Sequence, residues 1–460
     1  MAFVRPTGVT YFDPESAHHS YVLYSGGDGV TRLIDLNGAV HREWPYAGVP
    51  PRILDPALNG GRLGDVGVQL SAGDDPRGGI YANRTVGQLS WSGEPVWEWG
   101  RQAPGGAARQ NHDWELLPNG NRLLLVTIPR VVPALGDAVV GDQGLYEVTP
   151  EGELVWEWRA GDHLDELGFS AAGWDALRRT VARDPDDPWG YLEINSAKTL
   201  GPNHRHRADP DGVFHPDNIL ISYRKANIVA LIDRGTGAIV WKLGPYFEEE
   251  PGAQHQRINV HKVPRPLDQL SGQHNPHLIA EGLPGAGNIL VFDNQGGAGY
   301  PPAPLGIYAG SRVLEIDPAT EQIVWQYTAE DSGLPSWTFF SSFVSNAQRL
   351  PNGNTLVTEG MTGRLFQVTA EGRVVWEYHS PYVGLGVAGE PEVREPRVPG
   401  VDRATETSLV YRAQAVPFDW VPVGPPRTPP APVDTRATGI RPPSTAADSR
   451  HTGAPGSATP

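Results

Sequence analysis

The stretch Leu145-Tyr-Glu-Val-Thr-Pro-Glu-Gly152-Glu-Leu-Val-Trp156-Glu-Trp158 decides the fold. Apolar and polar residues alternate on both sides of a tight turn, and this period of two is typical of a β-strand with one buried face. The stretch therefore predicts an antiparallel hairpin whose second strand ends in large aromatic side chains.

Five further segments follow the same pattern. The six copies run from Leu33 to Trp44, Leu89 to Trp99, Leu145 to Trp158, Val229 to Leu243, Val313 to Tyr327 and Leu365 to Tyr378. A tryptophan recurs four residues after the turn in five of them, whereas the first copy has Arg42 there. Ahead of several copies, an Asn-Gly or Gly-Asn turn such as Asn119-Gly120 or Asn352-Gly353 signals a second hairpin.

Two hairpins make a four-stranded sheet. Six such sheets in one chain predict an all-β fold, a six-bladed β-propeller of four-stranded antiparallel blades. The repeated Trp and Tyr side chains would fill the space between blades. Val410 to Val416 looks like a last strand that closes the ring by pairing with the first sheet. We therefore assign residues 1–420 to one propeller domain.

The spacing of the repeats also predicts insertions over one rim of the propeller. The two longest intervals contain them, at Gly161 to Pro188, with a short helix from Ser170 to Arg183, and at Phe247 to Leu270. Such loops often cover a site or contact a partner. Residues 421–460 are rich in Pro, Thr, Ala and Gly, a composition that buries little apolar surface and predicts a disordered tail.

Composition excludes several classes of function. The 460 residues include no cysteine, which rules out disulfides, thiolate metal sites and a thiol nucleophile. The formal net charge of −16 argues against a nucleic-acid partner. No apolar run is long enough to cross a membrane and no signal peptide is visible, so we expect no membrane partner and a cytoplasmic protein. A removed leader would instead indicate a periplasmic or secreted one.

The sequence also favours the absence of cofactors. It contains no glycine-rich phosphate loop between a strand and a helix. His204, His206 and His215, and the oxygen-rich segment from Asp209 to Asp217, do not match zinc or calcium spacings, so we expect no metal. The oligomeric state does not follow from the sequence.

Several strings resemble those of the bacterial PAPS-independent arylsulfate sulfotransferases. They are His112-Asp-Trp-Glu-Leu-Leu-Pro-Asn-Gly-Asn121, Tyr191-Leu-Glu-Ile-Asn-Ser-Ala197, His215-Pro-Asp-Asn-Ile-Leu-Ile-Ser-Tyr-Arg224, Gly272-Gln-His274-Asn-Pro-His277 and Asn346-Ala-Gln-Arg-Leu-Pro-Asn-Gly-Asn354. The resemblance covers most of residues 8 to 380. It implies a six-bladed propeller with its site at the central channel.

Hairpin geometry predicts where the polar residues of these strings meet. The start of a first strand and the end of a second strand lie at the same end of a hairpin. His112, Glu193, His274 and Asn346 lie at first-strand starts, and Thr127, Arg224 and Asn294 lie at second-strand ends. We expect them to converge on one mouth of the channel, the default binding site for this shape.

The resemblance implies roles for these residues. His274 resembles the histidine that takes a sulfuryl group from a phenolic sulfate and passes it, through a sulfohistidine, to a second phenol. Arg224 resembles the arginine that grips the sulfate oxygens. His112 is then a proton-transfer group. We expect further contacts to a small aromatic substrate from Asn195, His277, Asn294, Asn346 and Gln348, and ring stacking from one of Phe169, Trp174, Trp189, Tyr246 and Phe247.

One position departs from the family pattern. Glu193 stands where the family carries a histidine. A carboxylate about 4 Å from a sulfate costs on the order of 4 kcal/mol at an effective dielectric near 20. Either Glu193 is protonated, or it pairs with Arg224 and weakens the grip on the anion, or the chemistry has changed. His204 and His206 are candidates to compensate.

Three functions remain open on the sequence. The first is sulfuryl transfer between phenols. The second is acid–base chemistry by Glu193 and a histidine on a small aromatic or polyketide-like substrate. The third is a propeller that binds without catalysis, since propellers host many functions.

Overall fold

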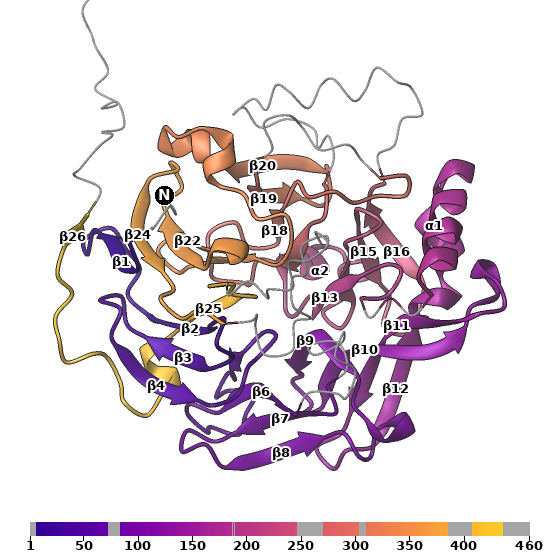
Figure 1. Cartoon of the computed structure of the whole chain (residues 1–460), viewed down its shortest axis with the longest axis horizontal. Helices are drawn as coiled ribbons and strands as arrows, with labels where there is room; N and C mark the ends of the chain where they lie inside the picture. Colours follow the sequence, from indigo (N-terminus) through magenta and orange to yellow (C-terminus); the bar gives the residue numbers. More distant parts are fainter. Residues whose placement is uncertain are drawn as a thin grey trace, which may run out of the picture.

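The computed structural model describes residues 6–71, 83–185, 187, 189–245, 270–302, 310–384 and 407–435. Six antiparallel sheets surround a central axis (Figure 1). Five contain four strands, and the sixth carries two further strands at its outer edge. The protein is a six-bladed β-propeller, as the hairpin repeat predicts.

Each blade runs from an innermost strand at the channel to an outermost strand at the rim. In that order, blade 1 contains β25 (Ala413–Val416), β2 (Tyr21–Ser25), β3 (Thr31–Ile34) and β4 (Val40–Trp44). Blade 2 contains β5 (Arg52–Ile53), β6 (Val66–Ser71), β7 (Thr85–Leu89) and β8 (Pro95–Trp99). Blade 3 contains β9 (Gln110–Leu116), β10 (Arg122–Val131), β11 (Val139–Val148) and β12 (Leu154–Arg159).

The other three blades follow the same order. Blade 4 contains β13 (Ile194–Thr199), β14 (Ile219–Tyr223), β15 (Ile228–Ile232) and β16 (Ile239–Leu243). Blade 5 contains β17 (His274–Leu278), β18 (Ile289–Asp293), β19 (Arg312–Asp317) and β20 (Gln322–Tyr327). Blade 6 contains β21 (Asn346–Arg349), β22 (Thr355–Glu359), β23 (Arg364–Val368) and β24 (Val374–His379), then β1 (Gly8–Phe12) and β26 (Val433–Asp434).

Helical segments are few and short. The α-helices are α1 (Ala171–Arg183) and α2 (His204–Ala208). Single 3-10 turns are η1 (Pro104–Gly106), η2 (Pro133–Leu135), η3 (Ala160–Asp162), η4 (Leu164–Leu167), η6 (Ala329–Ser332), η7 (Ser336–Thr338), η8 (Gly360–Thr362) and η9 (Phe418–Trp420).

The repeat forms the third and fourth strands of every blade, counted from the channel. In the copy that decides the fold, Leu145 of β11 pairs with Trp158 of β12, and Gly152 occupies the turn between them with φ of +92°. Only glycine adopts that angle without strain. Strands nearer the middle of a blade, such as β14 and β15, are buried along their whole length. The core therefore lies between the blades, as the aromatic repeat predicts.

Tryptophan side chains join one blade to the next. At five of the six seams an indole Nε1 donates a hydrogen bond to a carbonyl oxygen in the outer turn of the next blade. The pairs are Trp99 to Gly152 (3.1 Å), Trp158 to Gly237 (2.9 Å), Trp241 to Pro318 (3.1 Å), Trp325 to Ala370 (2.7 Å) and Trp376 to Leu36 (2.8 Å). At the remaining seam Trp44 packs edge-on against Trp91, with 5.7 Å between ring centroids.

Two separate pairings close the ring. As predicted, the C-terminal strand β25 pairs with β2, with Val416 opposite Tyr21. The N-terminal strand β1 pairs with β24 at the far edge of blade 6. β26 then adds to β1, and Val421 is buried in the core. Residues 421–435, which the sequence assigned to the tail, are described in the structure, and within them Val433 and Asp434 pair with the edge strand β1. Residues 436–460 lie outside the described part of the chain.

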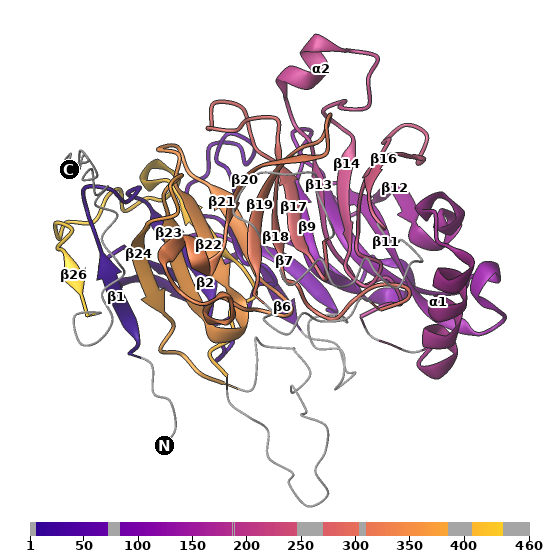
Figure 2. The ribbon, with the colours of Figure 1, turned by 90° about the horizontal axis from the view of Figure 1, so that it is seen from above.

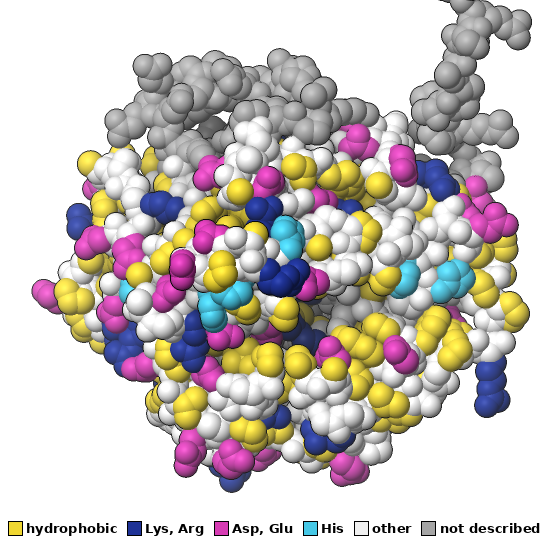
Figure 3. Space-filling view, turned by 180° about the vertical axis from the view of Figure 1, so that it is seen from behind, with side chains coloured by type: hydrophobic (Ala, Val, Ile, Leu, Met, Phe, Trp, Pro, Cys, Tyr) yellow, Lys and Arg dark blue, Asp and Glu magenta, His cyan; other side chains and the backbone are white. Residues whose placement is uncertain are grey.

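The first predicted insertion contains the expected helix. Ser170 caps α1, because its hydroxyl accepts from the Gly173 N–H at 3.1 Å. Figure 2 shows α1 at the outer edge of the propeller and α2 projecting from one face, and in Figure 3 histidine and basic side chains gather over α2. Of the second predicted insertion, residues 247–269 lie outside the described ranges.

We expect the seam hydrogen bond to be measurable by comparing two tryptophans. Trp376 and Trp44 are both fully buried, but among the described residues the Trp44 Nε1 has no acceptor. Both Trp376→Phe and Trp44→Phe lose ring area, and only Trp376→Phe leaves a carbonyl without its donor. The first variant should therefore lose about 1 kcal/mol more stability than the second. Equal losses in urea unfolding would show that the bond contributes nothing.

Candidate functional site

The innermost strands are distorted at one mouth of the channel. The angle φ is +47° at His112 in β9, +46° at Glu193 just before β13 and +51° at Asn275 in β17. Such angles cost a non-glycine residue about 1–3 kcal/mol. His112 and Asn275 lie at register shifts in the pairing of their strands, and Glu193 lies two residues before the shift in β13. Bulges of this kind redirect side chains and recur next to functional sites.

The strand starts and ends meet here as hairpin geometry predicts. The Thr127 hydroxyl accepts from the Asn111 amide at 2.7 Å, beside His112. Arg224 pairs with Glu193 across 2.8 Å. The two pairs join second-strand ends to first-strand starts.

His274 is buried and held at both ring nitrogens. Its Nδ1 lies 2.7 Å from the Asn294 Oδ1 and 3.0 Å from the Gly272 carbonyl oxygen, so Nδ1 carries the hydrogen. The Val344 N–H donates to Nε2 at 3.1 Å. Burial and the charge of Arg224 hold the pKa of His274 well below its usual range. The ring is therefore neutral, with its Nε2 lone pair directed at the Val344 amide.

Asn294 links His274 to the segment that carries Val344. Besides accepting from His274, its Nδ2 donates to the carbonyl oxygens of Ser341 and Val344, at 2.7 and 3.0 Å. The segment that approaches the histidine is itself strained, with φ of +53° at Val344 and +86° at Ser345. Asn294, which the sequence marked for substrate binding, is a positioning residue.

His112 is the second buried histidine of the mouth. Its Nδ1 lies 3.0 Å from the Asn111 Oδ1, and the Asn111 amide nitrogen is used as a donor to Thr127. Nδ1 therefore carries the hydrogen and Nε2 the lone pair. Burial, then the neighbouring His274 and Arg412, hold the pKa of His112 well below its usual range. Its ring lies 6.1 Å from that of Trp189 and 6.0 Å from that of Tyr411, centroid to centroid.

Glu193 neutralises the arginine that the family pattern assigns to the sulfate. The Arg224 Nη1 donates to the Glu193 Oε2 at 2.8 Å, and the Lys225 Nζ lies 3.7 Å from the same oxygen. Lys225 also pairs with Asp187. The sequence left open whether Glu193 is protonated, pairs with Arg224 or belongs to a changed chemistry, and the structure contains the ion pair with Arg224. His204 and His206 do not compensate, because α2 follows the far end of β13, away from Glu193 (Figure 2).

Three other predicted substrate contacts brace neighbouring blades. The Asn195 amide donates to the Gln273 carbonyl oxygen at 2.8 Å. Asn346 donates to the Ala413 carbonyl oxygen at 3.0 Å, and Gln348 accepts from the Ala415 N–H at 2.8 Å. These amides satisfy main-chain groups of the next innermost strand, so their side chains hold the channel wall together.

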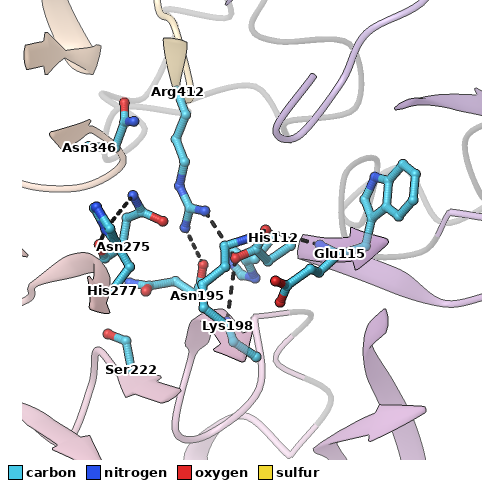
Figure 4. Close-up of polar contacts among 12 residues, drawn as sticks. His112, Glu115, Asn195, Lys198, Ser222, Asn275, His277, Asn346 and Arg412 are labelled. Atoms are coloured by element: carbon cyan, nitrogen blue, oxygen red, sulfur yellow. Dashed lines mark hydrogen bonds and ion pairs between the residues drawn. The ribbon is translucent and has the colours of Figure 1, made fainter. Parts of the chain in front are cut away.

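A group of charges that the sequence did not reveal lies deeper in the channel. Asp113 is fully buried, and its carboxylate is within 3.0 Å of the Arg52 Nη2, 2.8 Å of the Lys198 Nζ and 3.2 Å of the Arg412 Nη1. Figure 4 shows Arg412 extending between Asn346 and His112, with Lys198 across the channel. Asp113 and Lys198 belong to the quoted strings or follow them directly. Arg52 and Arg412 are far from both in sequence, so no local spacing could have indicated them.

His277 faces this charged group. Burial lowers its pKa to about 4, and the charges of Lys198 and Arg412 act in the same direction. Its Nδ1 lies 3.0 Å from the Asn275 carbonyl oxygen, so Nδ1 donates. In Figure 4, His277 and Asn275 lie opposite His112. Position and residue type suit contact with a molecule in the channel.

The predicted aromatic contacts divide into three groups. Trp189 lies beside His112. Phe169 and Trp174 pack on each other at 5.7 Å between centroids, within the core of the insertion, and do not reach the mouth. Tyr246 and Phe247 lie outside the described residues.

We also searched the described ranges for metal-binding groups and membrane-spanning helices. These ranges hold no group of three or more His, Asp or Glu side chains placed to bind a metal ion. Among the helices of the same ranges, none is long and apolar enough to span a membrane.

The chain belongs to the arylsulfotransferase family. Residues 80–380, well over half of its length, match the family Arylsulfotransferase (ASST). The resemblance seen in the quoted strings is thereby confirmed, and with it an arylsulfotransferase-like function in general terms. No curated protein sequence matches the chain.

Several solved structures are similar to the chain at low identity. A Bacteroides caccae protein of unknown function is 13% identical, with a TM-score of 0.42 over 86% of this chain and 98% of its own. Virginiamycin B lyase of Staphylococcus aureus, in complex with quinupristin, is 10% identical, with a TM-score of 0.35 over 82% and 91%. A periplasmic gluconolactonase of Pseudomonas aeruginosa is 12% identical, with a TM-score of 0.39 over 80% and 97%. At these identities the likeness concerns the propeller alone.

We expect half-buried His277 to make folding sensitive to acid. Below the ordinary histidine pKa of about 6.5 the unfolded chain binds a proton that folded His277, with a pKa of about 4, does not bind. The free energy of unfolding therefore falls as the pH falls from about 6.5 toward 4. Over that pH interval, the free energy of unfolding of His277→Asn should fall by about 1–3 kcal/mol less than that of the wild type. Urea unfolding at a series of pH values measures this, with exposed His215→Asn as the control. If the free energy of unfolding of His277→Asn fell with pH as steeply as that of the wild type, His277 would not be held neutral in the folded protein.

Proposed function

We propose that this protein transfers a sulfuryl group from a phenolic sulfate to a phenolic acceptor at the channel mouth. The observation that carries the proposal is the pair of buried, neutral histidines, His112 and His274, both within electrostatic reach of Arg224 and Arg412. Family membership supports the same class of reaction. A neutral imidazole is the form that attacks, and arginines stabilise the charge that develops on the sulfuryl oxygens.

The first half-reaction uses His274 as the nucleophile. Its Nε2 lone pair forms a bond to sulfur while the bond from sulfur to the phenolic oxygen breaks, and the released phenolate takes a proton. The Val344 N–H, which now donates to Nε2, must give way to the incoming sulfur. It would then be placed to donate to a sulfuryl oxygen. The Asn294 contact holds the ring orientation throughout.

The second half-reaction regenerates the enzyme. An acceptor phenol loses its proton as its oxygen attacks sulfur, and the bond from sulfur to Nε2 breaks. His112, whose Nε2 carries the lone pair, is the proton-transfer group. Trp189 beside it offers a ring face for the phenol. The two half-reactions balance and give ping-pong kinetics.

Intact-protein mass spectrometry tests this scheme. Mixed with 4-nitrophenyl sulfate, the wild type should release nitrophenolate and gain the mass of one SO3 group, which a second phenol then removes. His274→Asn should show neither gain nor turnover, and exposed His215→Asn should behave as the wild type. An adduct that survives in His274→Asn but not in His112→Asn would move the nucleophile to His112. The absence of any adduct across several aryl sulfates would refute sulfuryl transfer.

A second prediction concerns Glu193. Glu193→Gln removes a negative charge and releases Arg224 to the substrate, so we expect kcat/KM for 4-nitrophenyl sulfate to rise by about tenfold to a hundredfold. Asp187→Asn is the matched control, because Asp187 holds Lys225 but not Arg224, and it should change kcat/KM less. Loss of activity in Glu193→Gln with retention in His274→Asn would instead favour acid–base chemistry by Glu193.

A further inference from the structure

The charges around Arg224 are balanced. Arg224 and Lys225 supply two positive charges, and Glu193 and Asp187 supply two negative charges in direct contact with them. An incoming sulfate would meet no excess of positive charge there. A carboxylate already holds the arginine that should grip the anion.

The charges around Asp113 are not balanced. Three cations, Arg52, Lys198 and Arg412, contact this single carboxylate. The next carboxylate along the strand, Glu115, is bound to the main-chain N–H and the hydroxyl of Thr199. With both carboxylates counted, the group keeps one positive charge more than it has negative charges.

Asp113 has no capacity for further donors. Its two oxygens accept from the three cations and from the N–H groups of Trp114 and Ala197, at 3.0 and 3.4 Å. A carboxylate offers about four lone-pair positions. Five donors already exceed that number, so the remaining N–H groups of the cations need another acceptor.

Those remaining donors are numerous. Within the described residues, the Lys198 ammonium and the Arg52 guanidinium each donate to Asp113 alone. An ammonium carries three N–H donors and a guanidinium carries five. Arg412 is buried, and its Nη2 donates to the Asn195 carbonyl oxygen while its Nε has no acceptor among the same residues. Arg52 and Lys198 are partly exposed, so an anion in the channel would meet donors that Asp113 does not occupy.

The group is within reach of the channel and of both histidines. The side chains of Arg52 and Lys198 remain 22% and 14% exposed. Asp113 follows His112 directly in β9, and the charge of Arg412 acts on both His112 and His274. Burial and the charge of Arg52 lower the pKa of Lys198 to about 8, as expected for an excess of positive charge.

We propose that Arg52, Lys198 and Arg412 form the anion subsite that takes the sulfate group of an aryl sulfate donor, in place of Arg224. Arg52 and Arg412 lie outside residues 80–380, whereas Lys198 lies inside, so two of the three cations come from parts of this chain beyond the family match. The inference rests on the proposed function only in naming the anion as a sulfate ester.

Binding of inorganic sulfate and of 4-nitrophenyl sulfate, measured by calorimetry at constant ionic strength, tests the subsite without requiring turnover. Lys198→Met and Arg52→Gln should each lower the affinity for both ligands by about tenfold or more, because each removes a charged donor. Arg224→Gln tests the competing position, which Glu193 already occupies, and should change affinity less than about threefold. Exposed Arg373→Gln is the matched control and should leave the affinity unchanged. Arg52 is partly exposed, so Arg52→Gln keeps the test available if Lys198→Met does not fold.

Other outcomes overturn the proposal. A tenfold loss of affinity in Arg224→Gln, with no loss in Lys198→Met or Arg52→Gln, would place the anion at Arg224. No binding of either sulfate by the wild type would remove the subsite, and tighter binding of 4-nitrobenzoate than of 4-nitrophenyl sulfate would assign it to a carboxylate. Sulfate binding without any sulfuryl adduct would leave the subsite standing while the proposed function fails.

Discussion

The pairing of β25 with β2 is the constraint on which this structure depends. It closes the ring with main-chain hydrogen bonds between segments separated by most of the chain. Arg412 directly precedes this strand, which presents Ala413 and Ala415 to the amides of Asn346 and Gln348. The pairing that closes the ring therefore also places Arg412 beside Asp113 and completes the charged group.

Charge balance distinguishes the two halves of the channel. On the side of Arg224, a glutamate replaces the histidine of the family pattern and forms an ion pair. On the side of Asp113, three cations share one carboxylate. Buried charges are stable only when paired, so the two arrangements differ in what they can accept from solution. The first has as many negative as positive charges, and the second has an excess positive charge that an anion would balance.

The histidines show how backbone strain and hydrogen bonding work together. His112 has a left-handed backbone and a ring held by Asn111, whereas His274 is approached by the strained segment at Val344. Strain of this kind persists only where the surrounding fold imposes it. In the propeller, the neighbouring innermost strands impose it, because each is braced to the next by side-chain amides.

The sequence by itself determined the fold and much of the mouth. The period-two hairpins and recurring tryptophans predict six blades, since both signals are local, and strand starts and ends predict that Arg224 meets Glu193. Local signals could not reveal that Asn195, Asn346 and Gln348 brace blades, that β26 pairs with β1, or that Arg52 and Arg412 share Asp113 with Lys198. Those contacts join residues from different blades or from the two ends of the chain, and only closure of the ring brings them together.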